Sequence, residues 1–377
     1  MAGESNHMSL MHNDKLTVRV GDLVSGFFWG GMTGNRETSQ SYFPKLNWDV
    51  WAATYRMMQE RPTASPIDWP LYPVWREMVH HRFRGTKNPE CVTGWDWATW
   101  SKVWRRTVDS FTQHGYDPGR IIESEKYTVS IERDGSLCVG QGNKRVALLR
   151  ITEGLDFEIK VRVVQRHPEW VALKKGLYDV PGKMDLYQPL DHPDFAGWSI
   201  TQPCAERWKM IHEWLGPAWF EAKQPRNVLD IGCHTGWFCR KFAAQGCKVM
   251  GIDSKPTALR AAFVASVFRH DDGNAPRYIK GDCSAIYGDY DVCLCLSLIM
   301  HLFAQTEHDE AWRQLAAISK RCRVMFLDCV WGGYTKHLPF TPVGLPAAFM
   351  KHTTYTHFHL LGRTAHENRP FYVFWRD

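Results

Sequence analysis

The residues best suited to chemistry lie in one short stretch, VLDIGCHTGWFCRKFAAQGCKVMGID, which runs from residue 228 to residue 253. It contains an apolar run, a turn flanked by glycines, a helical segment and a second apolar run that ends in Asp253. The two apolar runs predict buried strands over 227–231 and 248–253, with a helix over 237–245 between them. A β-α-β unit of this length implies parallel strands and a ligand at their carboxyl ends.

The turn itself restricts which ligand this unit binds. A dinucleotide motif needs glycines at its first, third and sixth positions, where this chain has Gly232, His234 and Trp237. The two bulky side chains disfavour a nicotinamide or flavin dinucleotide, and no Gly-Lys-Ser/Thr sequence is present to bind a nucleoside triphosphate. A ligand with a ribose and no phosphate fits such a turn. We therefore expect S-adenosylmethionine, with Asp253 accepting hydrogen bonds from both ribose hydroxyls.

The segments that follow continue the alternation of strands and helices. The sequence predicts helices over 256–270 and 307–320 and strands over 277–280, from 291 into a turn at 297–301, over 323–330, near 355–361 and over 370–375. Five strand-helix units closed by a hairpin-like antiparallel pair predict an α/β fold with a seven-stranded, doubly wound, Rossmann-like sheet.

This pattern resembles the class I S-adenosylmethionine-dependent methyltransferases over about residues 205–377. DIGCHTG is similar to the first motif of the family, Asp253 to the acid of the second, GDC to the third, and LSLIMHL to the segment after the fourth strand. His234 stands where glycine is commonest, but histidine tolerates positive φ. The resemblance implies that the cofactor is bound by Asp230, Gly232, Cys233, His234, Gly236 and Trp237 (methionine half), Asp253 and Ser254 (ribose), Asp282 and Cys283 (adenine), and Ser297 (near the sulfonium).

Methyl transfer itself needs alignment and a dry cavity, and a base only where the acceptor must lose a proton. His301, beyond the fourth predicted strand, is the best-placed histidine for that role, with His357 and His359 behind it; a structural histidine is the alternative. The segment WGGYTKHLPFTPVGLPAAFMKH is rich in glycine and proline, as a substrate lid would be. We expect Trp331, Tyr334 and His337 to contact the acceptor, unless this is an ordinary packed loop.

A second resemblance covers about 45 residues upstream. The segment from Tyr127 to Trp170 predicts a strand, an Asp-Gly turn, a short strand, a glycine loop, a helix and a strand, and it is similar to the ParB/sulfiredoxin-like fold. That fold places a G-x-x-x-R element at a helix start and binds nucleotide phosphates there. Backbone N–H groups and two cations would also make an anion site on physical grounds. The element here comprises Gly140, Gln141, Gly142, Asn143, Lys144 and Arg145.

The remaining sequence sets the domain boundaries. We expect a disordered tail over 1–13, then a smaller α+β domain of the ParB/sulfiredoxin-like type with Trp-rich helical additions over 14–180. A linker over 181–204 and the methyltransferase domain over 205–377 complete the chain. Helical spacing over 47–59 and 95–111 and nine tryptophans between 27 and 104 predict either an aromatic core or a surface that stacks sugars or bases.

Composition narrows the partners. The net charge of +6 permits an anionic acceptor, but no concentrated basic patch argues for a dedicated nucleic-acid protein, so a nucleic-acid acceptor stays open without being favoured. Eleven scattered cysteines without a C-x-x-C pair suggest neither a disulfide framework nor a metal site. Without a signal sequence or a membrane-spanning run, we expect a cytoplasmic protein.

These features leave two functions open. The first is a methyltransferase, most simply an O-methyltransferase, whose N-terminal domain binds a nucleotide or orients a small-molecule, glycan or nucleotide-containing acceptor. The second is a nucleotide-responsive binding protein with a non-catalytic methyltransferase-like domain, and a kinase or nucleotide hydrolase fused to a methyltransferase is a further alternative. No Asn/Asp-Pro-Pro-Tyr/Phe sequence follows the fourth predicted strand, so methylation of DNA bases is disfavoured.

Overall fold

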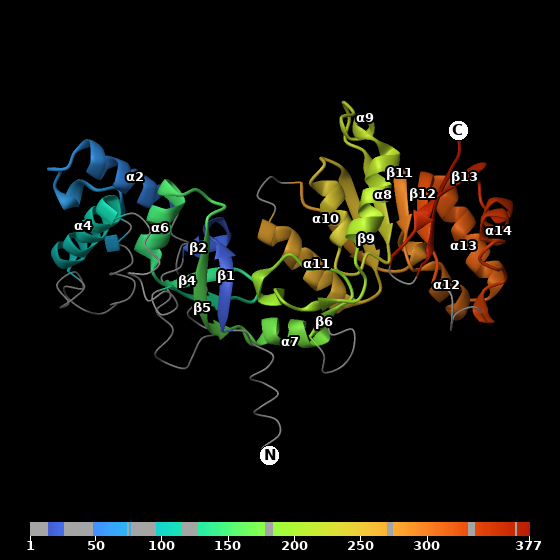
Figure 1. Cartoon of the computed structure of the whole chain (residues 1–377), viewed down its shortest axis with the longest axis horizontal. Coiled ribbons are helices and arrows are strands. Elements are labelled where there is room, and N and C mark those ends of the chain that lie inside the picture. Colours follow the sequence, from blue (N-terminus) through green and yellow to red (C-terminus); the bar gives the residue numbers. More distant parts are fainter. Residues whose placement is uncertain are drawn as a thin grey trace, which may run out of the picture. The chain divides into compact units, whose positions relative to one another are not determined.

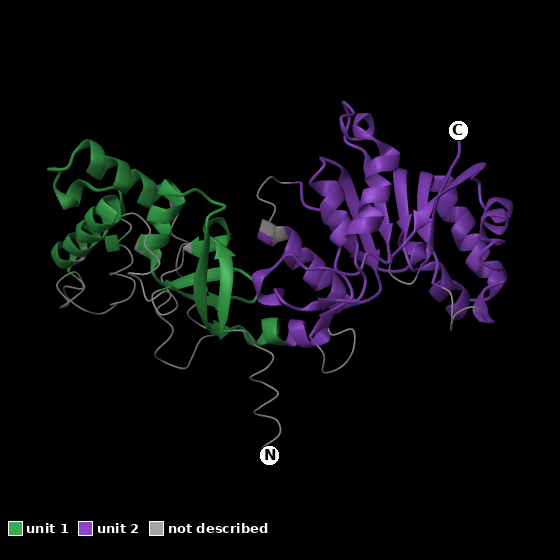
Figure 2. Cartoon of the chain, viewed as in Figure 1, with its two compact units in different colours: residues 1–171 green, residues 172–377 purple. Residues whose placement is uncertain are grey.

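The chain divides into two compact units, Met1–Val171 and Ala172–Asp377, which are described separately (Figure 2). The structure is a computed structural model that describes residues 14–25, 48–73, 75–76, 96–114, 127–177, 184–269, 274–330, 336–365 and 368–377. The predicted tail over 1–13 lies outside the described residues. None of the helices in these ranges is long and apolar enough to cross a membrane.

A five-stranded mixed sheet forms the centre of the first unit, in the order β1-β5-β3-β4-β2. Its strands are β1 (Lys15–Arg19), β2 (Leu23–Ser25), β3 (Thr128–Ile131), β4 (Leu137–Gln141) and β5 (Glu158–Arg166). β3 and β4 form the antiparallel hairpin expected from the Asp134-Gly135 turn, where Gly135 has a φ of 82°. Helix α6 (Asn143–Thr152) follows β4 directly. The unit is therefore α+β as expected, whereas its relation to the ParB/sulfiredoxin-like fold stays a prediction.

The tryptophans of the first unit build an apolar core. Helices α2 (Trp48–Glu60) and α4 (Trp97–His114) occupy the two segments with predicted helical spacing, and the short turn η3 (Pro66–Asp68) lies between them. Trp51 and Trp104 meet edge to face at 5.0 Å, and Trp69 and Trp75 are equally buried in the same cluster. The described part of the region thus supports aromatic packing. Trp29, Trp95 and the side chains of Trp48 and Trp100 lie outside the described residues.

The second unit contains the predicted seven-stranded sheet, in the order β10-β9-β8-β11-β12-β14-β13. Five strands are parallel and β14 is antiparallel to both of its neighbours, which confirms the Rossmann-like fold. The strands are β8 (Asn227–Ile231), β9 (Lys248–Asp253), β10 (Arg277–Lys280), β11 (Tyr290–Cys295), β12 (Cys322–Asp328), β13 (His357–Arg363) and β14 (Pro370–Trp375).

Helices cover both faces of this sheet (Figure 1). Alternate residues of β8 enter two separate core clusters: Leu229 and Ile231 join one, and Val228 joins the other. Such strands are apolar on both faces, as parallel strands in doubly wound sheets are. The helices are α8 (Ala205–Leu215), α9 (Pro217–Phe220), α10 (Trp237–Ala243), α11 (Pro256–Arg269), α12 (Ile299–Gln305), α13 (His308–Arg321) and α14 (Leu345–His352), with the short turn η6 (Cys283–Ala285).

The segment expected to be a linker packs onto the second unit where it is described. From Met184 on it forms β6 (Asp185–Leu186), η5 (Pro193–Phe195) and β7 (Ser199–Ile200). Lys174, on α7 (Pro168–Gly176), forms a buried ion pair of 2.8 Å with Asp194. The predicted boundaries of the linker itself are not decided by these contacts and stay a prediction.

Candidate active site

The carboxyl ends of β8, β9, β10, β11 and β12 meet at one edge of the large sheet, as parallel strands require. The turn after β8 is tied to β9, because the N–H groups of Gly232 and Cys233 both donate to the carbonyl of Ile252, at 2.8 and 3.1 Å. The N–H of Gly281, after β10, donates to the carbonyl of Asp253 at 3.0 Å. The structure therefore brings three of the predicted motifs together at this edge.

His234 and Asp253 contact each other directly. His234 adopts a φ of 50°, so the histidine is accommodated in a left-handed turn. Its N–H donates to Asp253 Oδ2 at 2.8 Å, and the N–H of Lys255 donates to Asp253 Oδ1 at 2.8 Å. Asp253 is largely buried, whereas Ser254 is exposed beside it. The two strand ends are thus joined through one carboxylate.

The glycine of the turn at position 236 is required twice over. It has a φ of 70°, and a Cβ there would overlap the side chain of Tyr278, with the ring carbon Cε1 only 2.8 Å away. The next residue, Trp237, starts α10 and is buried in the apolar core beside Phe238, with ring centroids 5.0 Å apart. We expected Trp237 to line the methionine half of the cofactor, and this core position leaves that role a prediction.

Asp230 lies at the carboxyl end of β8 and is fully enclosed. Burial raises its pKa from 3.8 to about 7, and the nearby charge of Asp253 acts in the same direction. Cys239 Sγ donates to Asp230 Oδ2 at 3.3 Å and opposes this rise. Burial raises the pKa of the Cys239 thiol well above its ordinary value. The hydrogen bond with Cys239 lowers the pKa of Cys233, the next predicted residue of the turn, but burial and the nearby charge of Asp230 raise it overall. Neither thiol is therefore an activated nucleophile.

The predicted adenine side of the site is more open. Asp282 is exposed after β10, and its Oδ1 accepts the N–H and the hydroxyl of Ser284 at 2.8 and 2.6 Å. These hydrogen bonds lower the pKa of Asp282, which is therefore ionised at neutral pH. Cys283 is half-buried, and burial raises its pKa to about 11.

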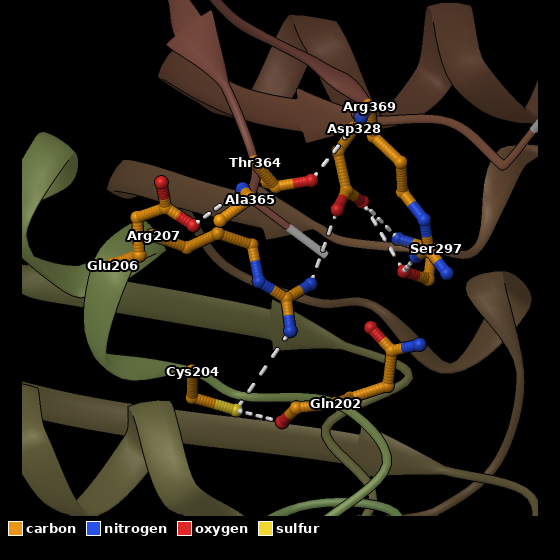
Figure 3. A network of polar contacts seen from close by, with 9 residues as sticks. All are labelled: Gln202, Cys204, Glu206, Arg207, Ser297, Asp328, Thr364, Ala365 and Arg369. Atoms are coloured by element: carbon orange, nitrogen blue, oxygen red, sulfur yellow. Dashed lines mark hydrogen bonds and ion pairs between the residues drawn. The ribbon is translucent and has the colours of Figure 1, made fainter. Parts of the chain in front are cut away.

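Ser297, after β11, lies in a network of buried polar groups (Figure 3). Asp328, the last residue of β12, accepts hydrogen bonds from the Ser297 N–H and hydroxyl. Its other oxygen accepts from Arg207 Nη1 of α8 at 3.1 Å, and Arg369 Nη1 donates to Ser297 Oγ at 2.7 Å. Three segments far from Ser297 in the sequence therefore meet around this predicted site residue, two by direct contact and α8 through Asp328.

His301 lies in the first turn of α12, because the chain reverses at Ser297 and the helix begins at Ile299. The prediction of a turn from 297 through 301 was wrong in this respect. Burial lowers the pKa of His301, and the charge of Lys255 lowers it further. His357, at the start of β13, is not near His301. Two strands, β12 and β14, separate β11 from β13, which is the edge strand of the sheet.

The predicted acceptor contacts are only partly described. Trp331 and Tyr334 lie outside the described residues. His337 is half-buried, and its carbonyl oxygen lies 3.0 Å from His308 Nε2.

Four residues at this edge were missed by the sequence reasoning: Tyr187, Arg207, Asp328 and Arg369. The ring of Tyr187 lies 4.9 Å from that of His234. Asp328 carried a usable signal, since it ends a predicted strand as Asp253 does. The other three lie in segments without a motif, and no pattern in the sequence would have found them.

The predicted anion site of the first unit lies where β4 meets α6. Gly142 precedes α6 with a φ of 97°, and a Cβ at Gly140 would lie 3.0 Å from Thr128 Oγ1. Asn143, the first residue of the helix, is buried, and Arg145 is half-buried. The side chain of Lys144 lies outside the described residues.

Comparison with known proteins places a methyltransferase on the same stretch. Residues 228–321 match the model of a methyltransferase domain. The chain is 23% identical over 150 residues to the O-antigen chain terminator bifunctional methyltransferase/kinase WbdD of Escherichia coli, covering 38% of this chain and 21% of that protein. It is 32% identical over 81 residues to the ubiquinone biosynthesis O-methyltransferase of Nitrosospira multiformis, covering 20% of this chain and 33% of that protein.

A crystal structure of WbdD with a kinase inhibitor aligns with a TM-score of 0.45 and 20% identity, over 54% of this chain and 47% of that chain. The two sequence matches span about a fifth of the length of WbdD and a third of the length of the Nitrosospira protein. The domain match covers β8 to α13, which carry the glycine turn, Asp253, Asp282 and His301. Residues 228–321 of this chain therefore carry a methyltransferase domain on a Rossmann-like sheet.

Proposed function

We propose that this chain is an S-adenosylmethionine-dependent methyltransferase that acts on an oxygen atom of an anionic, sugar-containing or nucleotide-containing acceptor. The observation that carries the proposal is the hydrogen bond between the His234 N–H and Asp253. It sets a carboxylate beside a turn that has a histidine where a dinucleotide motif has glycine. The relatives named as O-methyltransferases support oxygen as the accepting atom, and the O-antigen chain terminator supports a glycan as one class of acceptor.

The residues present fit this cofactor. Each Asp253 oxygen accepts one backbone N–H, and each retains a lone pair for a ribose hydroxyl. Asp282 uses only Oδ1 for Ser284, so its Oδ2 can accept from an adenine amino group. Gly232, Cys233 and Ser297 would hold the methionine half, with Ser254 and Cys283 beside the nucleoside.

When bound, S-adenosylmethionine supplies a methyl group on a positively charged sulfur, which leaves with the bonding electrons as the acceptor oxygen attacks in line. The protein has to align the acceptor and exclude water. His301 is suited to take the acceptor proton on its imidazole nitrogen, because its lowered pKa keeps the ring neutral at pH 7.

Calorimetric titration tests cofactor binding. Wild-type protein should bind S-adenosylmethionine, and Asp253→Ala should weaken binding by tenfold or more because two ribose hydrogen bonds are lost. Asp289→Ala, at an exposed aspartate before β11, serves as the matched control. Equal affinity of wild type and Asp253→Ala would contradict the assignment of the site.

The acceptor class requires a transfer experiment. Incubation with cofactor labelled in the methyl group and fractionated host extract should place the label in glycan, nucleotide-linked or small-molecule fractions. Loss of that label in His301→Ala, with cofactor affinity retained, would support His301 as the base. Cofactor binding without any transfer would favour a non-catalytic binding protein.

For the first unit we propose nucleotide binding or orientation of the acceptor through Gly140–Arg145. Gly142, the left-handed residue before α6, has no side chain with which to cap the helix, and an anion could take the place of such a cap. Titration with ATP should give binding that Arg145→Ala removes and Arg133→Ala, at an exposed arginine of the same unit, retains. ATP consumption would favour the kinase or hydrolase alternative, and unchanged binding by Arg145→Ala would contradict this site.

A further inference from the structure

We propose that Asp328 is a positioning residue of the methyltransferase site. From the end of β12 it holds Ser297 in a left-handed conformation, and Ser297 in turn places Leu298 against the glycine turn and starts the helix that carries His301. This inference rests on the proposed function only where binding of S-adenosylhomocysteine is measured, and the hydrogen-exchange measurement is independent of that function.

Ser297 adopts a conformation that a serine does not hold unaided. Its φ is 53°, and the left-handed region lowers the population of an L-residue roughly 5- to 30-fold relative to the right-handed one. Only three non-glycine residues in the described ranges have a positive φ: His234, Ser297 and Asn368. Such conformations persist where surrounding contacts impose them, and they cluster at functional sites.

The contacts that impose it come from Asp328 and Arg369. The Ser297 N–H and hydroxyl both donate to Asp328 Oδ1, the hydroxyl at 3.3 Å. Arg369 Nη1 donates to the same hydroxyl oxygen at 2.7 Å. Asp328 is completely buried, so these hydrogen bonds form away from competing water.

Asp328 is itself held in place from the other side. Its Oδ2 accepts from Arg207 Nη1, and the Arg207 guanidinium lies over the ring of Phe238, 5.4 Å from the centroid. One carboxylate oxygen thus serves the guanidinium of α8 and the other serves Ser297. This division fixes the direction of the carboxylate.

The turn between β13 and β14 fixes Arg369 (Figure 3). The Arg369 N–H donates to Thr364 Oγ1 at 3.2 Å, and the Thr364 N–H donates to the Arg369 carbonyl at 2.9 Å. The N–H of Ala365 donates to Glu206 Oε2 of α8 at 2.8 Å. Both partners of Ser297 are therefore tied to α8, one through Arg207 and one through Glu206.

The conformation of Ser297 determines where the next residues lie. Leu298 Cδ1 lies 3.4 Å from the position of a Cβ on Gly232, so this side chain packs against the glycine turn. The N–H of His301 donates to the Leu298 carbonyl at 2.9 Å in the first turn of α12. A right-handed Ser297 would send the chain in another direction and move both residues.

A simpler role for Asp328 is to neutralise buried Arg207. The two roles predict different effects when substitutions at positions 328 and 297 are combined. If Asp328 is only a counterion for Arg207, the effect of substituting Asp328 does not depend on the residue at position 297. A residue that holds position 297 left-handed becomes less important when that position is glycine, which adopts positive φ without a penalty. Alanine also lacks the hydroxyl but keeps the penalty, so it is the matched control.

The experiment compares Asp328→Asn alone with Asp328→Asn/Ser297→Gly and Asp328→Asn/Ser297→Ala. Affinity for S-adenosylhomocysteine is measured by calorimetry, and hydrogen exchange is measured for the peptide that spans residues 296–302. We expect Asp328→Asn to weaken binding about tenfold and to speed exchange. The two double variants both lack the Ser297 hydroxyl, so they are compared with each other. The glycine double variant should bind more tightly and exchange more slowly than the alanine double variant.

Equal behaviour of the glycine and alanine double variants would overturn the proposal, as would wild-type binding and exchange by Asp328→Asn. If Asp328→Asn does not fold, Ser297→Gly is compared with Ser297→Val while Asp328 and Arg207 stay intact. The valine variant should then bind about tenfold more weakly and exchange faster than the glycine variant, and equality would overturn the proposal. If wild-type protein binds no S-adenosylhomocysteine, the proposed function fails, and hydrogen exchange still decides the role of Asp328.

Discussion

Asp230→Asn should make the stability of the second unit less dependent on pH. Asp230 lies enclosed at the end of β8, where burial raises its pKa from 3.8 to about 7. Between these two values the native state binds a proton that the unfolded state has released. The free energy of unfolding therefore falls as the pH rises through this window, and the contribution is lost above about pH 7.

The size of the effect follows from the two pKa values. Each pH unit between them corresponds to about 1.4 kcal/mol, so wild-type protein loses about 4 kcal/mol from this group between about pH 4 and pH 7. Asparagine has nearly the same shape and no proton to lose. Relative to wild type, Asp230→Asn should gain about 2 to 3 kcal/mol of stability when the pH is raised from 5 to 8.

The assay is urea unfolding of both proteins at a series of pH values between 5 and 8.5. Pulsed hydrogen exchange of the β8 and β11 peptides restricts the signal to the second unit, since a chain with two units need not unfold in one step. Asp289→Asn, at an exposed position, controls for the loss of a carboxylate. We compare the free energy of unfolding of Asp230→Asn minus that of wild type at each pH. The reasoning is refuted if this quantity stays constant over the range or falls as the pH rises.

Two further predictions concern stability and the pH dependence of transfer. Lys174→Ala should lower the free energy of unfolding of the second unit by about 3 to 5 kcal/mol, because it leaves the buried Asp194 carboxylate without its 2.8 Å partner. Urea unfolding checks this against Lys175→Ala at the exposed neighbour, and equal losses would contradict it. Once the labelled acceptor is identified, the rate of transfer should rise with pH and have its inflection below pH 6.5, since burial and Lys255 lower the pKa of His301 from 6.5. Lys255→Ala should move that inflection to higher pH, and an inflection above pH 7 in wild type would argue against His301 as the base.

Local patterns in the sequence were enough to predict the sheet and the glycine turn. The strands at 227–231 and 248–253 are buried apolar runs, and parallel strands joined through a helix bring their carboxyl ends to one edge. The ends of these strands were therefore expected at one ligand site, whereas the direct hydrogen bond between His234 and Asp253 was not predicted. Gly236 was expected from the motif, although its contact with Tyr278 of β10 was not.

The tertiary structure decided the polar network around Ser297 and the protonation of Asp230. Asp328 and Arg369 reach Ser297, and Arg207 reaches Asp328, from segments more than 30 residues away from Ser297. Their meeting depends on strand order and on the β13–β14 turn. The pKa of Asp230 follows from the burial of its carboxyl group, which no short window of sequence contains. Strands and turns are set by neighbouring residues along the chain, whereas charge and side-chain direction in a buried site are set by neighbours in space.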